Sequence, residues 1–102
     1  MKTLNKTFAL LITLGALTFA NAASGADIYT KCVACHGINA EKKAMGKSQV
    51  IAGWEKTKTV AALQGYKDGS YGGAMKGVMK GQVTRLSDAE IEAVAEFIAT
   101  KK

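Results

Sequence analysis

Residues 32–36 read Cys-Val-Ala-Cys-His, and they hold both cysteines and the only histidine of the 102-residue chain. A random scatter of these three residues would give this C-x-x-C-H arrangement with a probability on the order of 10⁻⁴. On a helix, Cys32 and Cys35 project from one face, and His36 falls on that same face. The two thiols can form thioethers to the two vinyl groups of a haem, while the imidazole reaches the iron. The spacing therefore predicts a covalently bound haem.

Three other uses of these residues fit the sequence less well. A thioredoxin-like redox pair also separates its cysteines by two residues, but it needs a βαβ context that this chain does not show. A structural zinc site needs four ligands, and the chain has no second Cys or His pair to supply them. A disulfide between Cys32 and Cys35 would close so short a loop that it would stabilise the fold little.

The N-terminus has the pattern of a secretory signal peptide. Two lysines precede an apolar run without acidic residues (8–20), and Ala20-Asn21-Ala22 has the small-x-small form of a cleavage site. The apolar run is shorter than the roughly 20 residues that cross a bilayer, which favours cleavage over an uncleaved membrane anchor. We therefore predict export to a bacterial periplasm, with residues 1–22 removed and residues 23–102 forming one domain.

The net charge of the chain limits the classes of partner that it could bind. The chain has 14 Lys and Arg against 8 Asp and Glu, and loss of the two signal lysines leaves 12 basic residues and a net charge of +4. Such a charge suits nucleic acid, a membrane surface or an acidic protein. Export argues against nucleic acid, and the lysines are too scattered to anchor the chain to lipid. We expect an acidic protein partner and no stable membrane insertion.

The first two thirds of the chain predict helices joined by loops. A short helix is expected over 27–36 and a polar loop over 38–53. A second helix is expected over 54–68, where Gly69 would end it. Between 69 and 81 five of thirteen residues are Gly, a density that predicts a loop.

The last helix has the strongest signals. Ser87 followed three residues later by Glu90 forms a capping box, and Leu86 precedes it for a hydrophobic staple. Apolar residues then recur at positions 91, 94, 95 and 98, the spacing of one helical face. Because no stretch alternates as a strand would, the predicted fold class is all-α.

A haem would also enlarge the hydrophobic core of so small a domain. A domain of about 80 residues buries only about 60% of the surface of its unfolded chain, so it usually needs a disulfide, a metal or a cofactor. The side chains available to cover a haem are large and mostly apolar: Trp54, Leu63, Tyr66, Tyr71, Ile91, Val94, Phe97 and Ile98.

The sequence resembles the class I c-type cytochromes, specifically the small bacterial monohaem cytochrome c-553 group. The resemblance covers residues 23–102. It rests on Ile28-Tyr29 ahead of 32–37, on the run Gly-Tyr-Lys-Asp-Gly-Ser-Tyr-Gly-Gly over 65–73, on Met79, and on 86–98. It implies a cytochrome c fold, with three to four short helices wrapped around one covalently bound haem c, and with the first and last helices crossing near the haem edge.

The resemblance implies that His36 and a methionine are the two axial iron ligands. Met79 aligns with the ligand of the family and Met75 does not, so Met75 is the second choice. Met79 also lies nine residues before Asp88, which leaves a short return to the last helix, whereas Met45 lies too soon after His36 to reach the opposite face of the haem. The proline that commonly follows this methionine in the wider class is replaced by lysine.

If protein fills both axial positions, one-electron exchange is the chemistry that remains. The resemblance therefore implies a soluble electron carrier rather than an enzyme, monomeric, shuttling between redox proteins such as a membrane oxidoreductase or a terminal oxidase or reductase. The alternative is a haem-based gas sensor or enzyme with an open or labile sixth position. Lysines of the two loops expected to border the haem are candidates for docking on an acidic partner: Lys42, Lys43, Lys47, Lys76 and Lys80.

Overall fold

The computed structural model describes residues 24–102, which form α-helices, one 3₁₀ helix and connecting loops without any strand. The expected signal peptide, residues 1–22, lies outside the described part. In chain order the elements are α2 (Gly25–Tyr29), α3 (Val33–His36), η1 (Ala44–Gly46), α4 (Lys56–Asp68), α5 (Lys76–Val83) and α6 (Asp88–Ala99). The predicted all-α class is confirmed, with five α-helices in residues 24–102 where three to four were expected.

The first expected helix is divided in two. Ser24 caps α2, because its hydroxyl accepts a hydrogen bond from the backbone N–H of Asp27 at 3.1 Å. The helix ends at Tyr29, and a turn over residues 30–32 leads into α3, which carries the Cys-x-x-Cys-His motif. Gly37 ends α3 with a positive φ of 89°. The motif therefore occupies a single helical turn with a sharp exit.

The second expected helix is confirmed with a later start. Helix α4 begins at Lys56 rather than Trp54 and ends at Gly69, which adopts the left-handed conformation at φ 86°. Ala62 and Leu63 are buried on one face of this helix. Tyr66, predicted to share that face, is half-buried.

The predicted loop over 69–81 is wrong in its second half. Residues 69–75 do form an irregular connection, but α5 begins at Lys76 and contains Gly77 and Gly81. Glycine weakens a helix by only about 1 kcal/mol relative to alanine, a cost that tertiary packing readily exceeds. Here the packing comes from Val83, which is buried at the end of α5, and from the contact of α5 with α4.

Helix α6 forms as predicted. Ser87 accepts a hydrogen bond from the Glu90 backbone N–H at 3.1 Å, and the Glu90 carboxylate accepts one from the Ser87 N–H at 2.9 Å, so the capping box is complete. The predicted apolar face, Ile91, Val94, Ala95 and Ile98, is buried in the centre of the core. Each large aliphatic side chain on it stabilises the fold by about 1.5–3 kcal/mol.

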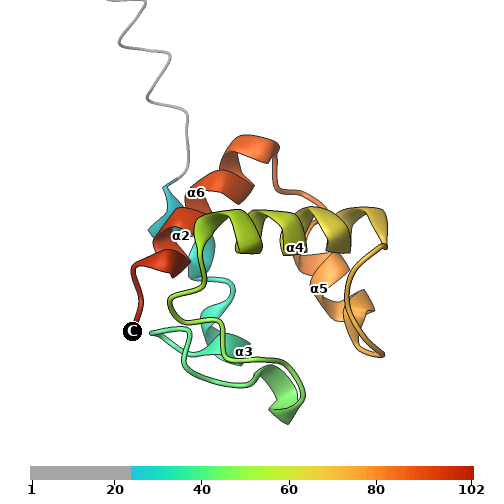
Figure 1. The fold of residues 1–102 in the computed structure, drawn as a ribbon, viewed down its shortest axis with the longest axis horizontal. Helices are drawn as coiled ribbons and strands as arrows, with labels where there is room; N and C mark the ends of the chain where they lie inside the picture. The colour runs from blue at the N-terminus through green and yellow to red at the C-terminus, as the bar shows by residue number, and fades with distance from the viewer. Residues whose placement is uncertain (1–23) are drawn as a thin grey trace, which may run out of the picture.

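The first and last helices of the described structure, α2 and α6, cross each other. Figure 1 shows α2 and α6 crossing at one end of α4, with α5 at the other end and α3 on the far side of the molecule from α4. The crossing of α2 and α6 is close, because Gly25 lies directly against the backbone of Ala93 and against Phe97. This agrees with the crossing of first and last helices that the family resemblance implies. No helix within residues 24–102 has the length and apolarity of a membrane span.

Candidate haem site

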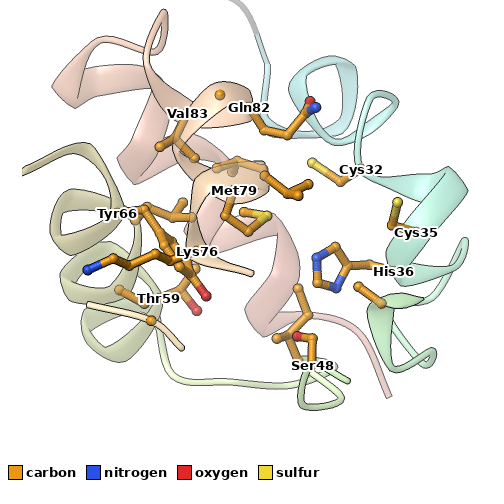
Figure 2. Close-up of a pocket in the computed structure, with 18 of the residues that line it drawn as sticks. Cys32, Cys35, His36, Ser48, Thr59, Tyr66, Lys76, Met79, Gln82 and Val83 are labelled. Atoms are coloured by element: carbon orange, nitrogen blue, oxygen red, sulfur yellow. The ribbon is translucent and has the colours of Figure 1, made fainter. Parts of the chain in front are cut away.

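A large cavity separates α3 from α4 and α5. Its volume is about 1070 Å³, slightly above the upper end of the 300–1,000 Å³ typical of small-molecule sites. The lining includes Cys32, Cys35, His36 and Met79 together with buried core residues such as Leu63. Figure 2 shows the two cysteines and the histidine on one side of this space and Met79 on the other. The structure therefore brings every sequence-predicted site residue to the wall of a single cavity.

His36 is buried at the wall of the cavity. Its side chain is only 6% exposed, and its Nδ1 atom has no hydrogen-bond partner in the described structure. Burial lowers the pKa of the imidazole below its ordinary value, so the ring is neutral at pH 7 and a nitrogen lone pair is available to a metal. The exit from the motif is fixed by Tyr29, whose hydroxyl donates a 2.7 Å hydrogen bond to the carbonyl of Gly37.

Both cysteines are free thiols at the edge of the cavity. Cys32 is half-buried and Cys35 is exposed. Burial, and next the neighbouring Cys35, raise the pKa of the Cys32 thiol, which keeps it protonated at neutral pH. Because the helical turn of α3 presents both sulfurs from the same side, they can react with two groups of one planar ligand.

The three methionines outside the signal differ in placement. Met79 lies in the middle of α5, is half-buried against the core, and points its sulfur toward His36 across the cavity (Figure 2). Met75 lies at the start of the same helix and is 44% exposed. Met45 lies in η1 on the α3 side and is 59% exposed, as expected for a residue without a ligand role. The geometry favours Met79 over Met75 as a ligand.

A close contact to α4 positions the loop that leads into α5. Tyr71 lies so near Gly65 that a Cβ on residue 65 would be 2.5 Å from the Cβ of Tyr71. The ring of Tyr71 meets that of Tyr66 edge to face, with centroids 5.1 Å apart. Lys76 then donates a 3.1 Å hydrogen bond to the carbonyl of Gly69, which closes the loop on itself. A side chain at position 65 would therefore push this loop away from α4, and with it the start of the helix that carries Met79.

The donors present fit a haem. Two adjacent thiols, a neutral imidazole and a facing thioether are the groups that attach a c-type haem and ligate its iron from two sides. A site for a bare metal ion is a different arrangement, and no group of three or more His, Cys, Asp or Glu side chains in residues 24–102 could form one.

The sequence model of the family described as cytochrome c matches residues 22–102. The chain belongs to the cytochrome c family. Membership of this family implies a covalently bound haem c with its iron, and the size of the chain fits one haem, in agreement with the cofactor predicted from the sequence.

Known members of the cytochrome c family are similar over most of their length. Cytochrome c-553 of Nitratidesulfovibrio vulgaris is 44% identical over 80 residues, which cover 78% of each chain. Cytochrome c-553 of Helicobacter pylori is 35% identical over 96 residues, 91% of this chain and 97% of its own. Cytochrome c-553 of Desulfomicrobium norvegicum is 42% identical over 77 residues, 74% of this chain and 94% of its own.

Some residues of the site were not singled out from the sequence of this cytochrome c. Gln82 lines the cavity three residues after Met79, and no sequence signal pointed to it because the helix that carries both residues was not predicted. Thr59 is buried with a hydroxyl that has no hydrogen-bond partner in the described structure, which no local pattern indicates. Of the lysines considered for docking, Lys47 and Lys76 line the cavity. The predicted loop position is wrong for Lys76 and Lys80, which both lie on α5.

Proposed function

We propose that this chain is a one-electron carrier that holds one haem c through Cys32 and Cys35, with His36 and Met79 as the axial ligands of the iron. The observation that carries the proposal is the cavity, across which His36 and Met79 face each other while both thiols lie at its wall. When bound, the haem would supply the redox chemistry, since its iron alternates between the ferrous and ferric states.

The four residues have distinct roles. Each thiol can add across a vinyl carbon–carbon double bond, with sulfur taking one carbon and the proton the other, so attachment needs no oxidant. The buried, neutral imidazole of His36 provides a nitrogen lone pair. The thioether of Met79 is a soft ligand that favours ferrous iron, and it therefore raises the reduction potential compared with a second histidine. Because protein fills both axial positions, the expected role is transfer rather than catalysis.

The proposal extends to location and partners. Residues 1–22 would direct export, residues 23–102 would form the mature protein in the periplasm, and a monomer would suffice for the function. Its partners would be redox proteins that present an acidic surface to lysines near the cavity, of which Lys47 and Lys76 line it. Salt-dependent electron transfer, treated in the Discussion, tests this docking.

Mass and absorption spectra of the purified protein test haem attachment. We expect the mass of residues 23–102 plus one haem, and a reduced spectrum typical of a c-type haem. Substitution of both Cys32 and Cys35 by Ala should leave haem that is extracted by acidified organic solvent. Two titratable thiols in the wild-type protein would overturn the proposal.

The axial sulfur is tested by a pair of substitutions in one helix. Met79→Ala should abolish the ferric charge-transfer band that is characteristic of sulfur ligation and lower the reduction potential. Met75→Ala should leave that band in place, because Met75 is exposed at the start of α5. Loss of the band in Met75→Ala alone would move the ligand to Met75.

Carbon monoxide distinguishes a carrier from a sensor or enzyme with an open sixth position. A carrier with both positions filled should bind the gas slowly and incompletely at neutral pH. Fast, stoichiometric binding to the native ferrous protein would contradict axial ligation by Met79 and favour the sensor or enzyme.

A further inference from the structure

The C-terminal end of α4 is tied to the connection between α5 and α6. Lys67, in the last turn of α4, donates a 2.8 Å hydrogen bond from its ammonium group to the backbone carbonyl of Leu86. The bond is partly buried and joins residues 19 positions apart. A charged donor to a carbonyl in such surroundings forms one of the stronger hydrogen bonds that proteins make.

A second bond from the same face of α4 reaches the same connection. Gln64 lies three residues before Lys67, so the two side chains project from one face of the helix. The amide of Gln64 donates a 2.9 Å hydrogen bond to the carboxylate of Asp88, the first residue of α6. Together, Lys67 and Gln64 hold both ends of the segment 86–88 against α4.

This segment is continuous with the helix that carries Met79. The backbone N–H of Leu86 donates to the carbonyl of Val83, the last residue of α5, at 3.0 Å. Thr84 binds the carbonyl of Lys80 through both its N–H, at 3.0 Å, and its hydroxyl, at 2.6 Å. Val83 lies one turn after Met79, is buried and lines the cavity. A shift of Leu86 would therefore move α5 as a unit.

We propose that Lys67 is a positioning residue, which holds α5 so that the Met79 sulfur stays directed at the haem iron. The proposal rests on Met79 being the axial ligand, as proposed above. Lys67 is not among the residues that line the cavity, and it acts through Leu86 and α5. Loss of its ammonium group would release the C-terminal end of α5 and let the sulfur leave the iron more often.

Imidazole added to the ferric holoprotein measures how often the sulfur leaves. Its apparent affinity is its intrinsic affinity multiplied by the fraction of molecules with an open axial position. Lys67→Met keeps most of the aliphatic stem and removes the charged donor, and we expect it to bind imidazole about tenfold more tightly than the wild type. Lys67→Arg, which keeps a charged donor, should restore most of the wild-type affinity.

Lys56→Met is the matched control. Lys56 lies on the same helix and also contacts α6, through an exposed 3.1 Å ion pair with Glu92, but it lies at the end of α4 away from the 86–88 segment. The control should bind imidazole as the wild type does. If Lys56→Met and Lys67→Met tighten imidazole binding equally, the effect is general loosening of the fold and the proposal is overturned.

Two further readouts separate the possible failures. Wild-type affinity in Lys67→Met, with the sulfur band present in the wild type, overturns the positioning role alone. A wild type that lacks the band, and whose spectrum Met79→Ala does not change, overturns the ligand assignment itself. If Lys67→Met does not fold, Gln64→Ala removes the second bond of the same segment and should also tighten imidazole binding, while unchanged binding in it would overturn the proposal.

Discussion

Tyr29 joins the helix before the Cys-x-x-Cys-His motif to the turn after it. Its ring is 2% exposed and its hydroxyl donates a 2.7 Å hydrogen bond to the Gly37 carbonyl. The ring also packs against Phe97 of α6, with centroids 5.5 Å apart. One side chain thus connects the motif with the helix crossing, which explains why a small local sequence can hold His36 at a fixed place in the cavity.

Removal of the Tyr29 hydroxyl should be costly although the ring remains. Tyr29→Phe leaves the buried Gly37 carbonyl with only the 3.1 Å hydrogen bond that the Ala40 N–H donates to it, and we expect the free energy of unfolding to fall by about 0.5–1.5 kcal/mol. Denaturant unfolding of the holoprotein at pH 7 measures it. A loss below about 0.5 kcal/mol would mean that water replaces the hydroxyl at Gly37.

The same residue makes stability depend on pH at the alkaline end. With Cys32 as a free thiol, burial first, and then the nearby Cys32 and Glu41, raise the pKa of Tyr29 from its ordinary value of 10.0 to about 12. In the holoprotein a Cys32 thioether carries no charge, and burial, the largest cause, still raises the pKa. The contribution to stability is therefore complete below pH 10, and it is lost as the pH rises through 12, because the unfolded chain ionises first. The difference in unfolding free energy between wild type and Tyr29→Phe should shrink over this range. A difference between the two proteins that stays constant from pH 10 to pH 12 would contradict the raised pKa of Tyr29.

At the scale of elements, the crossing of α2 and α6 depends on one missing methyl group. A Cβ on Gly25 would collide with the carbonyl oxygen of Ala93 and lie 2.9 Å from the Cβ of Phe97. Both neighbours belong to the rigid helix α6, so the two helices would have to separate.

Two glycine-to-alanine substitutions should therefore change the free energy of unfolding in opposite directions. Gly25→Ala should destabilise the protein by about 1–3 kcal/mol through overpacking. Gly77→Ala, on α5 where the new Cβ would meet no atom within 4 Å beyond its chain neighbours and the backbone of its own helix, should stabilise it by about 0.5–1 kcal/mol. Thermal unfolding followed by circular dichroism measures both effects, and the midpoint temperature should shift by about 4–8 °C for each kcal/mol. Equal midpoints for the two variants would contradict the close packing of α2 against α6.

The elements also show how far the sequence could predict the structure. The start and the buried face of helix α6 were predicted correctly because its capping box and apolar spacing are local signals. Helix α5 was missed because its glycines weaken the local signal, while its stability comes from contacts with α4 that are distant in sequence. The bond from Lys67 to Leu86 spans 19 residues and has no local signature at all.

The residues of the candidate site also differ in how far the sequence alone could predict them. Cys32, Cys35 and His36 lie within five residues, so their spacing alone predicts that they meet one ligand. Met79 comes from a distant helix, and the choice between Met79 and Met75 needed the family resemblance at first. The structure adds an independent physical reason, because helix α5 turns Met79 inward and leaves Met75 at its exposed start.

At the scale of the whole molecule, the charge near the cavity should govern encounters with redox partners. More basic than acidic residues line the cavity, so a field that attracts anions is expected where electrons leave: Lys31, Lys47, Lys76 and Arg85 against Asp27 and Glu90. Small redox ions test this field without a protein partner. Oxidation of the ferrous protein by hexacyanoferrate(III), an anion, should slow by about tenfold as salt rises from 0.01 M to 1 M, because the Debye length falls from about 30 Å to about 3 Å.

A cationic oxidant and two lysine-to-glutamate substitutions complete the test. Oxidation by tris(phenanthroline)cobalt(III) should become faster over the same range of salt, because screening removes its repulsion from the lysines. Lys47→Glu should weaken both salt dependences more than Lys102→Glu does, since the two variants have equal net charge and Lys102 does not line the cavity. Equal effects of the two substitutions would mean that the net charge of the molecule steers the encounter, and the docking role of lysines at the cavity would then be wrong.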